Sequence, residues 1–133
     1  KELLNKDGNH VEIIKSVIKN YFEFLSNNES FVKMVMWENL NKAYYLKMSD
    51  AFASKGIATE LLRKVLRDGI EKGLFKDSFD IDETVVSINM FCFSYFSNIS
   101  TMAHIMNMDF SDKTEIEKRA KHVTDIILGY IMK

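Results

Sequence analysis

The sequence predicts an all-α protein, and three observations support this prediction. The 133 residues include no proline and only five glycines, so few positions would interrupt a helix. Apolar residues recur at intervals of three and four, which places them on one side of a helix, whereas no segment alternates as a strand would. Polar residues suited to capping precede the apolar segments and divide the chain into about five main helices.

The length and the charge balance narrow the class of protein. A chain of 133 residues is expected to form one domain, residues 1–133. Eighteen Lys and Arg residues stand against nineteen Asp and Glu residues, for a net charge of -1. This balance disfavours nucleic acid or an anionic membrane as a direct partner of the chain, because both require a basic surface.

Cys92 is the single cysteine, so no internal disulfide can form. This fits a reducing compartment and a cytoplasmic location. Because Cys92 lies in an apolar segment, its thiol is expected to be buried and unreactive. No apolar run has the length of a membrane span, and no membrane partner is expected.

The first helix is expected over residues 10–25. Asn9 and Glu12 have the spacing of a capping box at its start. An apolar stripe that includes Phe22 follows with helical periodicity. His10, like His122 in the last helix, is expected at the surface.

The second helix is expected over residues 31–48, the most aromatic part of the chain. It contains Trp37, Tyr44 and Tyr45 as well as Met34. A helix with so many aromatic side chains requires a partner surface or a cavity. Consecutive helical residues point about 100° apart, so at most one of the two tyrosines is expected to face such a cavity.

The third helix is expected over residues 57–72. Gly73 suits the position just beyond its end, where a left-handed conformation is common. Gly69 lies inside the helix and either weakens it or marks a close approach of another group.

The fourth and fifth helices are expected over residues 81–108 and 112–132. Asp80 and Glu83 form a second capping box, and Ser111 is expected to cap the last helix. The fourth helix is apolar on two sides, and a small domain can cover one of them with its own core. The other side suggests a cavity or a second chain, as in a two-fold helical dimer. The residues expected at a dimer interface are Phe93, Ser97, Ser100, Val123, Ile126, Ile127 and Tyr130.

An ordered set of short motifs spans almost the whole chain from residue 9. The motifs are Phe31-Val32, Trp37-Glu38-Asn39-Leu40, Tyr44-Tyr45-Leu46, Leu61-Leu62 with Gly69, Gly73 and Phe75, Asp80-Ile81-Asp82, Tyr95-Phe96-Ser97-Asn98, Thr101-Met102, His122-Val123 and Gly129-Tyr130. In this order and with these helix lengths, the chain resembles the C-terminal regulatory domain of TetR/AcrR-family bacterial transcriptional repressors.

The resemblance implies a fold and a function. Members of this family have an N-terminal helix-turn-helix domain that binds operator DNA. Their larger all-helical C-terminal domain binds a small molecule and forms a homodimer, in which the last two long helices of each chain make a four-helix bundle. The helix-turn-helix segment is absent here, so the chain is expected to be the regulatory half alone, and residues 1–4 would lie near the junction.

A pocket for a small apolar or aromatic effector is therefore expected. Its candidate lining is mostly aromatic with a few polar groups. Each of these side chains has an alternative role in the core, and Asn98 requires a hydrogen-bond partner that is either a ligand or the second chain. The candidates are Phe22, Met34, Trp37, Tyr44, Phe91, Tyr95, Asn98 and His104.

Other functions are less consistent with the sequence. A helical carboxylate-bridged metal enzyme requires Glu-x-x-His pairs, which the sequence does not contain, and three dispersed histidines with one cysteine suggest no other metal site. We therefore expect no metal, no cofactor and no enzymatic activity. The charged run over residues 115–121 is expected to be a solvated helix face. The alternative function is a stand-alone helical dimerisation or adaptor module without a small-molecule ligand.

Overall fold

The computed structural model describes residues 9–49 and 56–133, and within these ranges every regular element is a helix. This confirms the predicted all-α class. No helix in the described ranges has both the length and the apolar character needed to cross a membrane. The elements are α1 (Asn9–Asn27), α2 (Glu29–Leu40), the short 3-10 helix η1 (Leu46–Met48), α3 (Gly56–Glu71), α4 (Ile81–Ser97), α5 (Ile99–Met106) and α6 (Lys113–Ile131).

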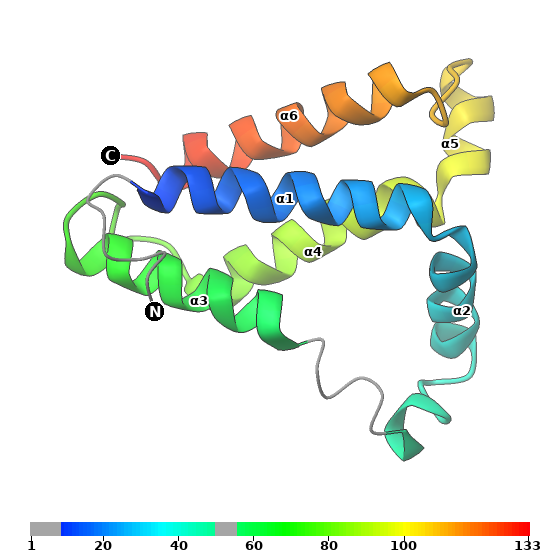
Figure 1. Cartoon of the computed structure of the whole chain (residues 1–133), viewed down its shortest axis with the longest axis horizontal. Helices are drawn as coiled ribbons and strands as arrows, with labels where there is room; N and C mark the ends of the chain where they lie inside the picture. The colour runs from blue at the N-terminus through cyan, green and yellow to red at the C-terminus, as the bar shows by residue number, and fades with distance from the viewer. Residues whose placement is uncertain (1–8, 50–55) are drawn as a thin grey trace.

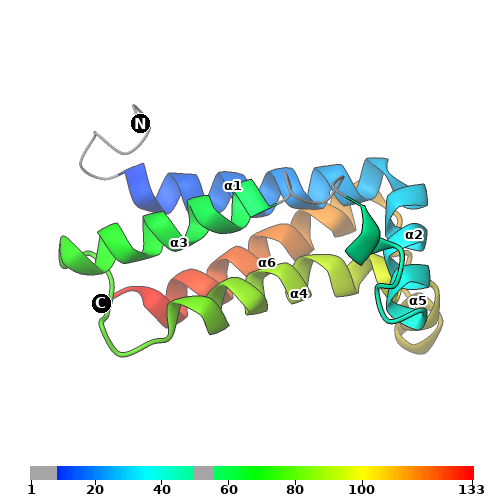
Figure 2. The same cartoon turned by 90° about the horizontal axis from the view of Figure 1, so that it is seen from below.

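Four long helices form a bundle. Helix α1 contacts α3, α4 and α6, and α4 also contacts α3 and α6. Figure 2 shows α1 and α3 in one layer and α4 and α6 in the other. Helices α2 and α5 stand at one end of the bundle, whereas the C-terminus lies at the opposite end (Figure 1).

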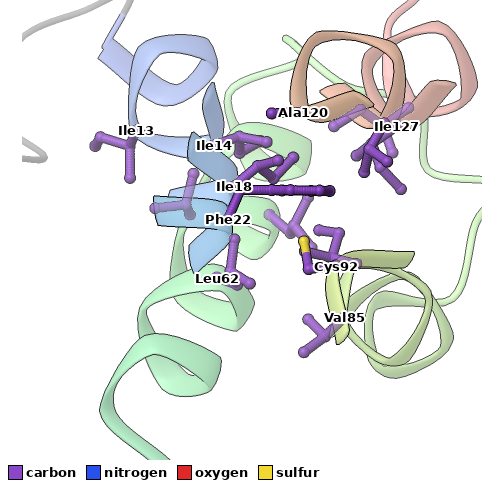
Figure 3. Close-up of a cluster of buried hydrophobic side chains, with 14 of the residues drawn as sticks. Ile13, Ile14, Ile18, Phe22, Leu62, Val85, Cys92, Ala120 and Ile127 are labelled. Atoms are coloured by element: carbon purple, nitrogen blue, oxygen red, sulfur yellow. The ribbon is translucent and has the colours of Figure 1, made fainter. Parts of the chain in front are cut away.

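The core lies between these two layers (Figure 3). Ile14 and Ile18 of α1 are fully buried there, together with Cys92 of α4. Burial raises the pKa of the Cys92 thiol to about 12, so the thiol is protonated at neutral pH. The expectation that Cys92 is buried is confirmed.

The end of α3 agrees with the sequence pattern. Gly73 has a positive φ of 71°, and the N–H of Leu74 donates to the carbonyl of Gly69 at 2.8 Å. A Cβ atom on Gly69 would lie 2.3 Å from two ring atoms of Phe75. Gly69 therefore allows the buried Phe75 ring to approach the helix backbone.

The second helix is shorter than predicted, because it ends at Leu40 and not near residue 48. Asn41 is the C-cap, and both its backbone N–H and its side-chain amide donate to the carbonyl of Trp37, at 3.1 and 2.9 Å. Lys42 and Ala43 then adopt positive φ values of 56° and 57°. The buried carboxylate of Glu38 accepts the N–H of Leu46 at 3.1 Å and holds this turn.

The fourth helix is not continuous over residues 81–108, because it breaks at Asn98. The Asn98 amide donates to the carbonyl of Ser94 and to the hydroxyl of Ser97, both at 3.0 Å. The backbone N–H of Asn98 also keeps its bond to the carbonyl of Ser94 at 3.1 Å, and α5 then leaves at an angle to α4 (Figure 1). Asn98 is exposed, so it is not the buried amide that the sequence suggested.

The start of α6 also differs from the prediction. Asp112, rather than Ser111, is the N-cap, and its carboxylate accepts the N–H of Thr114 at 3.1 Å. Ser111 instead donates its hydroxyl and its N–H to the carboxylate of Asp109, at 2.5 and 3.0 Å.

His10 is buried, and its expected surface position was wrong. Its Nε2 atom lies 2.5 Å from Oδ2 of Asp68, which joins α1 to α3. The ammonium of Lys72 lies 3.0 Å from the same oxygen. Because the partner is distant in sequence, the pattern of α1 alone could not reveal this pair.

Candidate functional site

A pocket of about 510 Å³ lies where α4, α5 and α6 meet. This volume is within the range of small-molecule sites, roughly 300–1,000 Å³. The lining residues are Ser94, Tyr95, Asn98, Met102, Met106, Met108, Phe110, Glu115, Lys118, Arg119 and His122.

The break at Asn98 and the segment before α6 shape this pocket. Because the chain turns between α4 and α5, Met102 and Met106 of α5 line the same pocket as Tyr95 of α4. The hydroxyl of Tyr95 donates to the carbonyl of Phe110 at 2.7 Å, and the two rings meet edge to face at 5.3 Å. These contacts hold the segment between α5 and α6 against α4.

Helix α6 supplies the charged side of the pocket. Glu115, Lys118, Arg119 and His122 recur at intervals of three and four and therefore share one face. The ammonium of Lys118 lies 3.1 Å from the carboxylate of Glu115. The pocket thus combines methionine and aromatic side chains from one direction with charged side chains from the other.

Tyr95 is a protonated hydrogen-bond donor at neutral pH. Burial, and secondarily the negative charge of Glu115, raise the pKa of its phenol to about 12, while the positive charge of Arg119 opposes this rise. The phenol therefore keeps its bond to Phe110 over the physiological pH range.

Two of the predicted ligand residues, Tyr95 and Asn98, line this pocket. Phe22 is buried in the core instead, where its ring contacts the ring of Tyr95 at 5.9 Å. Phe91 packs against the same core. His104 is exposed on α5 and is not among the lining residues.

Trp37 of α2 and the two tyrosines that follow this helix form a separate, exposed cluster. Trp37 stacks on Tyr45 with a centroid distance of 5.3 Å, and Tyr45 meets Tyr44 edge to face at 5.1 Å. Met34 is also exposed on α2. The sequence placed Tyr44 and Tyr45 on one helix and expected them to diverge, but the helix ends before them and their rings are in contact.

The sequence did not identify the charged side of the pocket. Glu115, Lys118 and Arg119 were assigned to a solvated face, whereas they line the cavity together with Met108 and Phe110. Adjacency to the core residue Ala120 is no signal for Arg119, because Lys121 also adjoins Ala120 and is exposed.

A second pocket of about 440 Å³ lies between α1, α2 and α4. It is mainly apolar and shares Ser94 with the first. The other residues that line this second pocket are Tyr21, Phe31, Val35, Asn89, Met90 and Phe93.

In the described ranges, no group of three His, Cys, Asp or Glu side chains is arranged to hold a metal ion.

Comparison with known proteins identifies the family. The model of the family described as "Tetracyclin repressor-like, C-terminal domain" matches residues 11–127. The chain belongs to this family. The predicted resemblance to TetR-type regulatory domains is thereby confirmed, and a tetracyclin repressor-like domain is a regulator and not an enzyme.

A curated relative supports this assignment of the chain. The chain is 25% identical over 118 residues to the HTH-type transcriptional repressor NicS of Pseudomonas putida. The match covers 88% of this chain and 56% of that protein. The chain therefore spans about half the length of the relative.

For a tetracyclin repressor-like domain, the outer faces of α4 and α6 are the expected dimer surface. Figure 2 shows these two helices together, in the layer opposite α1 and α3. Ile126 and Tyr130 of α6 are exposed, and so is Ser100 at the start of α5. Phe93 and Ser97 are half-buried.

Two predicted interface residues lie elsewhere. Val123 and Ile127 are buried in the core of the single chain, so their side chains leave no surface for a partner. Val86 and Met90 on α4 are exposed and apolar. Periodicity identified the apolar stripe of α6 but not which edge of it points outward.

Proposed function

We propose that this chain is the effector-sensing and dimerisation domain of a TetR-family repressor. A small apolar or aromatic molecule binds the pocket between α4, α5 and α6 and thereby alters operator binding by a separate N-terminal domain. The protein acts in the cytoplasm, where its DNA is. The observation that carries the proposal is that α4 and α6 both line the pocket and both carry exposed apolar residues elsewhere along their length.

This arrangement suggests how the two activities are coupled. Arg119 and His122 line the pocket, while Ile126 and Tyr130 follow on the next turns of the same helix. A ligand that favours one position of α6 would favour one arrangement of two chains. Because operator half-sites have a fixed spacing, a change in that arrangement changes affinity for DNA.

The dimer proposal rests on side-chain exposure in the single chain. Met90 is 65% exposed and Tyr130 is 55% exposed, and both belong to the layer formed by α4 and α6. An apolar surface of this kind is typical of an interface, since burying it against a second copy removes it from water. A two-fold axis would bring the same two helices from both chains into one four-helix bundle.

The mass of the chain in solution tests this part of the proposal. We expect a dimer by light scattering, and monomers after Met90→Lys or Ile126→Lys, because a charge would be buried in the interface. Met34→Lys is the matched control, since Met34 is 43% exposed but lies on α2. A wild-type monomer, or equal effects of all three variants, would refute the proposed interface. A dimer that binds no small molecule would favour the adaptor function.

A further inference from the structure

Arg119 is a half-buried cation at the pocket. Glu115, one helical turn earlier, already pairs with Lys118 at 3.1 Å. Among the ion pairs formed by residues 9–49 and 56–133, none includes Arg119. The guanidinium of Arg119 therefore lines the cavity without a carboxylate partner among the described residues.

The other carboxylates near the pocket have donors of their own. Asp109 accepts the hydroxyl and N–H of Ser111, and Asp112 accepts the N–H of Thr114 as the cap of α6. Turning either toward Arg119 would break these bonds. The positive charge of Arg119 also acts on the buried Cys92 thiol, where it opposes the larger effect of burial, which raises the pKa of that thiol.

The rest of the pocket is suited to an apolar molecule. Met102, Met106 and Met108 provide flexible thioether side chains, and Phe110 adds an aromatic ring. A volume of about 510 Å³ accommodates a molecule with one or two rings or a medium-length alkyl chain. One end of such a molecule would meet methionine, and the other would meet the guanidinium.

We infer that the pocket binds an organic carboxylate, whose oxygens accept hydrogen bonds from Arg119 while its apolar body contacts Met102 and Met106. Guanidinium and carboxylate have matched planar geometry, and a partly buried pair is stronger than one in water. A monoanion would balance Arg119, since Lys118 and Glu115 already balance each other. This inference rests on the proposed effector-binding function but is narrower, because a neutral ligand would serve that function equally well.

Three probes of the same shape test the inference: 2-naphthoate, 2-naphthamide and 2-naphthylmethylamine. Binding is followed by the NMR signals of carbon-13-labelled methionine methyl groups, which report on Met102, Met106 and Met108 directly. We expect naphthoate to shift these signals with an affinity about tenfold or more above that of the amide, as one charge-assisted pair provides. The amine should bind most weakly.

Variants assign the preference to Arg119. Arg119→Met should remove the difference between naphthoate and naphthamide, while Arg119→Lys should keep part of it because the charge remains. Arg67→Met is the matched control, since Arg67 is exposed on α3 and away from the pocket. Circular dichroism tests whether each variant is folded. If Arg119→Met is unfolded, Arg119→Lys still measures how the preference for naphthoate depends on the guanidinium.

Three results would overturn the inference. Equal affinity for naphthoate and naphthamide would mean that the pocket takes neutral ligands, in which case effector sensing stands and only the carboxylate fails. Tighter binding of 2-naphthyl phosphate than of naphthoate would replace the carboxylate by a phosphate group. If no probe shifts the three methionine signals, the pocket has no affinity for an apolar carboxylate. The dimerisation experiment still tests the proposed function separately.

Discussion

The hydroxyl of Tyr95 donates a hydrogen bond to the backbone carbonyl of Phe110 at 2.7 Å, and thereby joins α4 to the segment that leads into α6. Both residues line the pocket, so this bond defines one of its edges. The same ring also contacts Phe22 and Phe96 of the core. Tyr95 therefore connects the core, the pocket and the start of α6.

Replacing Tyr95 by Phe should loosen this connection. The Tyr95→Phe variant keeps the ring contacts but leaves the Phe110 carbonyl without its donor, which we expect to cost about 1 kcal/mol of unfolding free energy. Urea denaturation measures the cost, and amide hydrogen exchange should accelerate near Phe110. Tyr44→Phe is the control, because Tyr44 is exposed in the cluster after α2. An unchanged exchange rate near Phe110 would show that the bond does not hold the segment.

Two glycine substitutions should have opposite effects on stability. Gly69→Ala places a methyl group against the Phe75 ring, so we expect a loss of about 1–3 kcal/mol by chemical denaturation. Gly129→Ala meets no atom within 4 Å and lies inside α6. It should raise the stability of the monomer by roughly 0.5–1 kcal/mol, because alanine is the better helix former. The two are best compared in the Met90→Lys background. Similar losses in both variants would contradict the close contact between Gly69 and Phe75.

Alkaline pH should destabilise the chain. The pKa of Cys92 rises from 9.0, and that of Tyr95 from 10.0, to about 12 in the folded state. The folded state then holds protons that the unfolded state has lost, so stability is complete below pH 9.0 and falls as pH rises toward 12. Denaturation at several pH values measures the slope, and Cys92→Ala should reduce it. A slope that is the same with and without Cys92 would refute the contribution of its buried thiol.

The His10–Asp68 pair should support stability in mild acid. Hydrogen bonds from His10 and then Lys72 hold the pKa of the Asp68 carboxyl below its ordinary value of 3.8. Its contribution is therefore present above pH 3.8 and is lost as pH falls through the lower folded-state value. Asp68→Asn should lower stability at neutral pH and reduce the dependence on pH below 3.8. Asp77→Asn serves as a control, since Asp77 is exposed in the turn after α3.

The fold was predictable from the sequence because most helices carry their own signals. Periodic apolar residues, the capping box at Asp80 and the glycine at residue 73 all operate within one helical turn of the residues they control. The ends near Asn41 and Asn98 were not predictable by this route. The apolar pattern continues past both residues, and Asn39 and Asn89 bind the carbonyl four residues earlier just as Asn41 and Asn98 do, although the helix continues past them.

The pocket depends on that second break, which explains why only part of it was predicted. Tyr95 and Asn98 were selected for their residue types, and both line the cavity. Arg119 was not selected, because a charge on a helix is usually solvated and nothing in its own segment shows that α5 turns toward it. Trp37 was selected for its size, yet it lies beyond the end of the bundle near Tyr45.

The central claim is that occupancy of the pocket controls the DNA affinity of the whole repressor. The most direct measurement is the affinity of the whole protein, including its DNA-binding segment, for a DNA fragment selected in vitro. It is made with and without a compound that saturates the Met106 methyl signal. We predict a change in DNA affinity of about fivefold or more, as is usual for coupled sites. Unchanged DNA affinity with the pocket fully occupied would contradict the account.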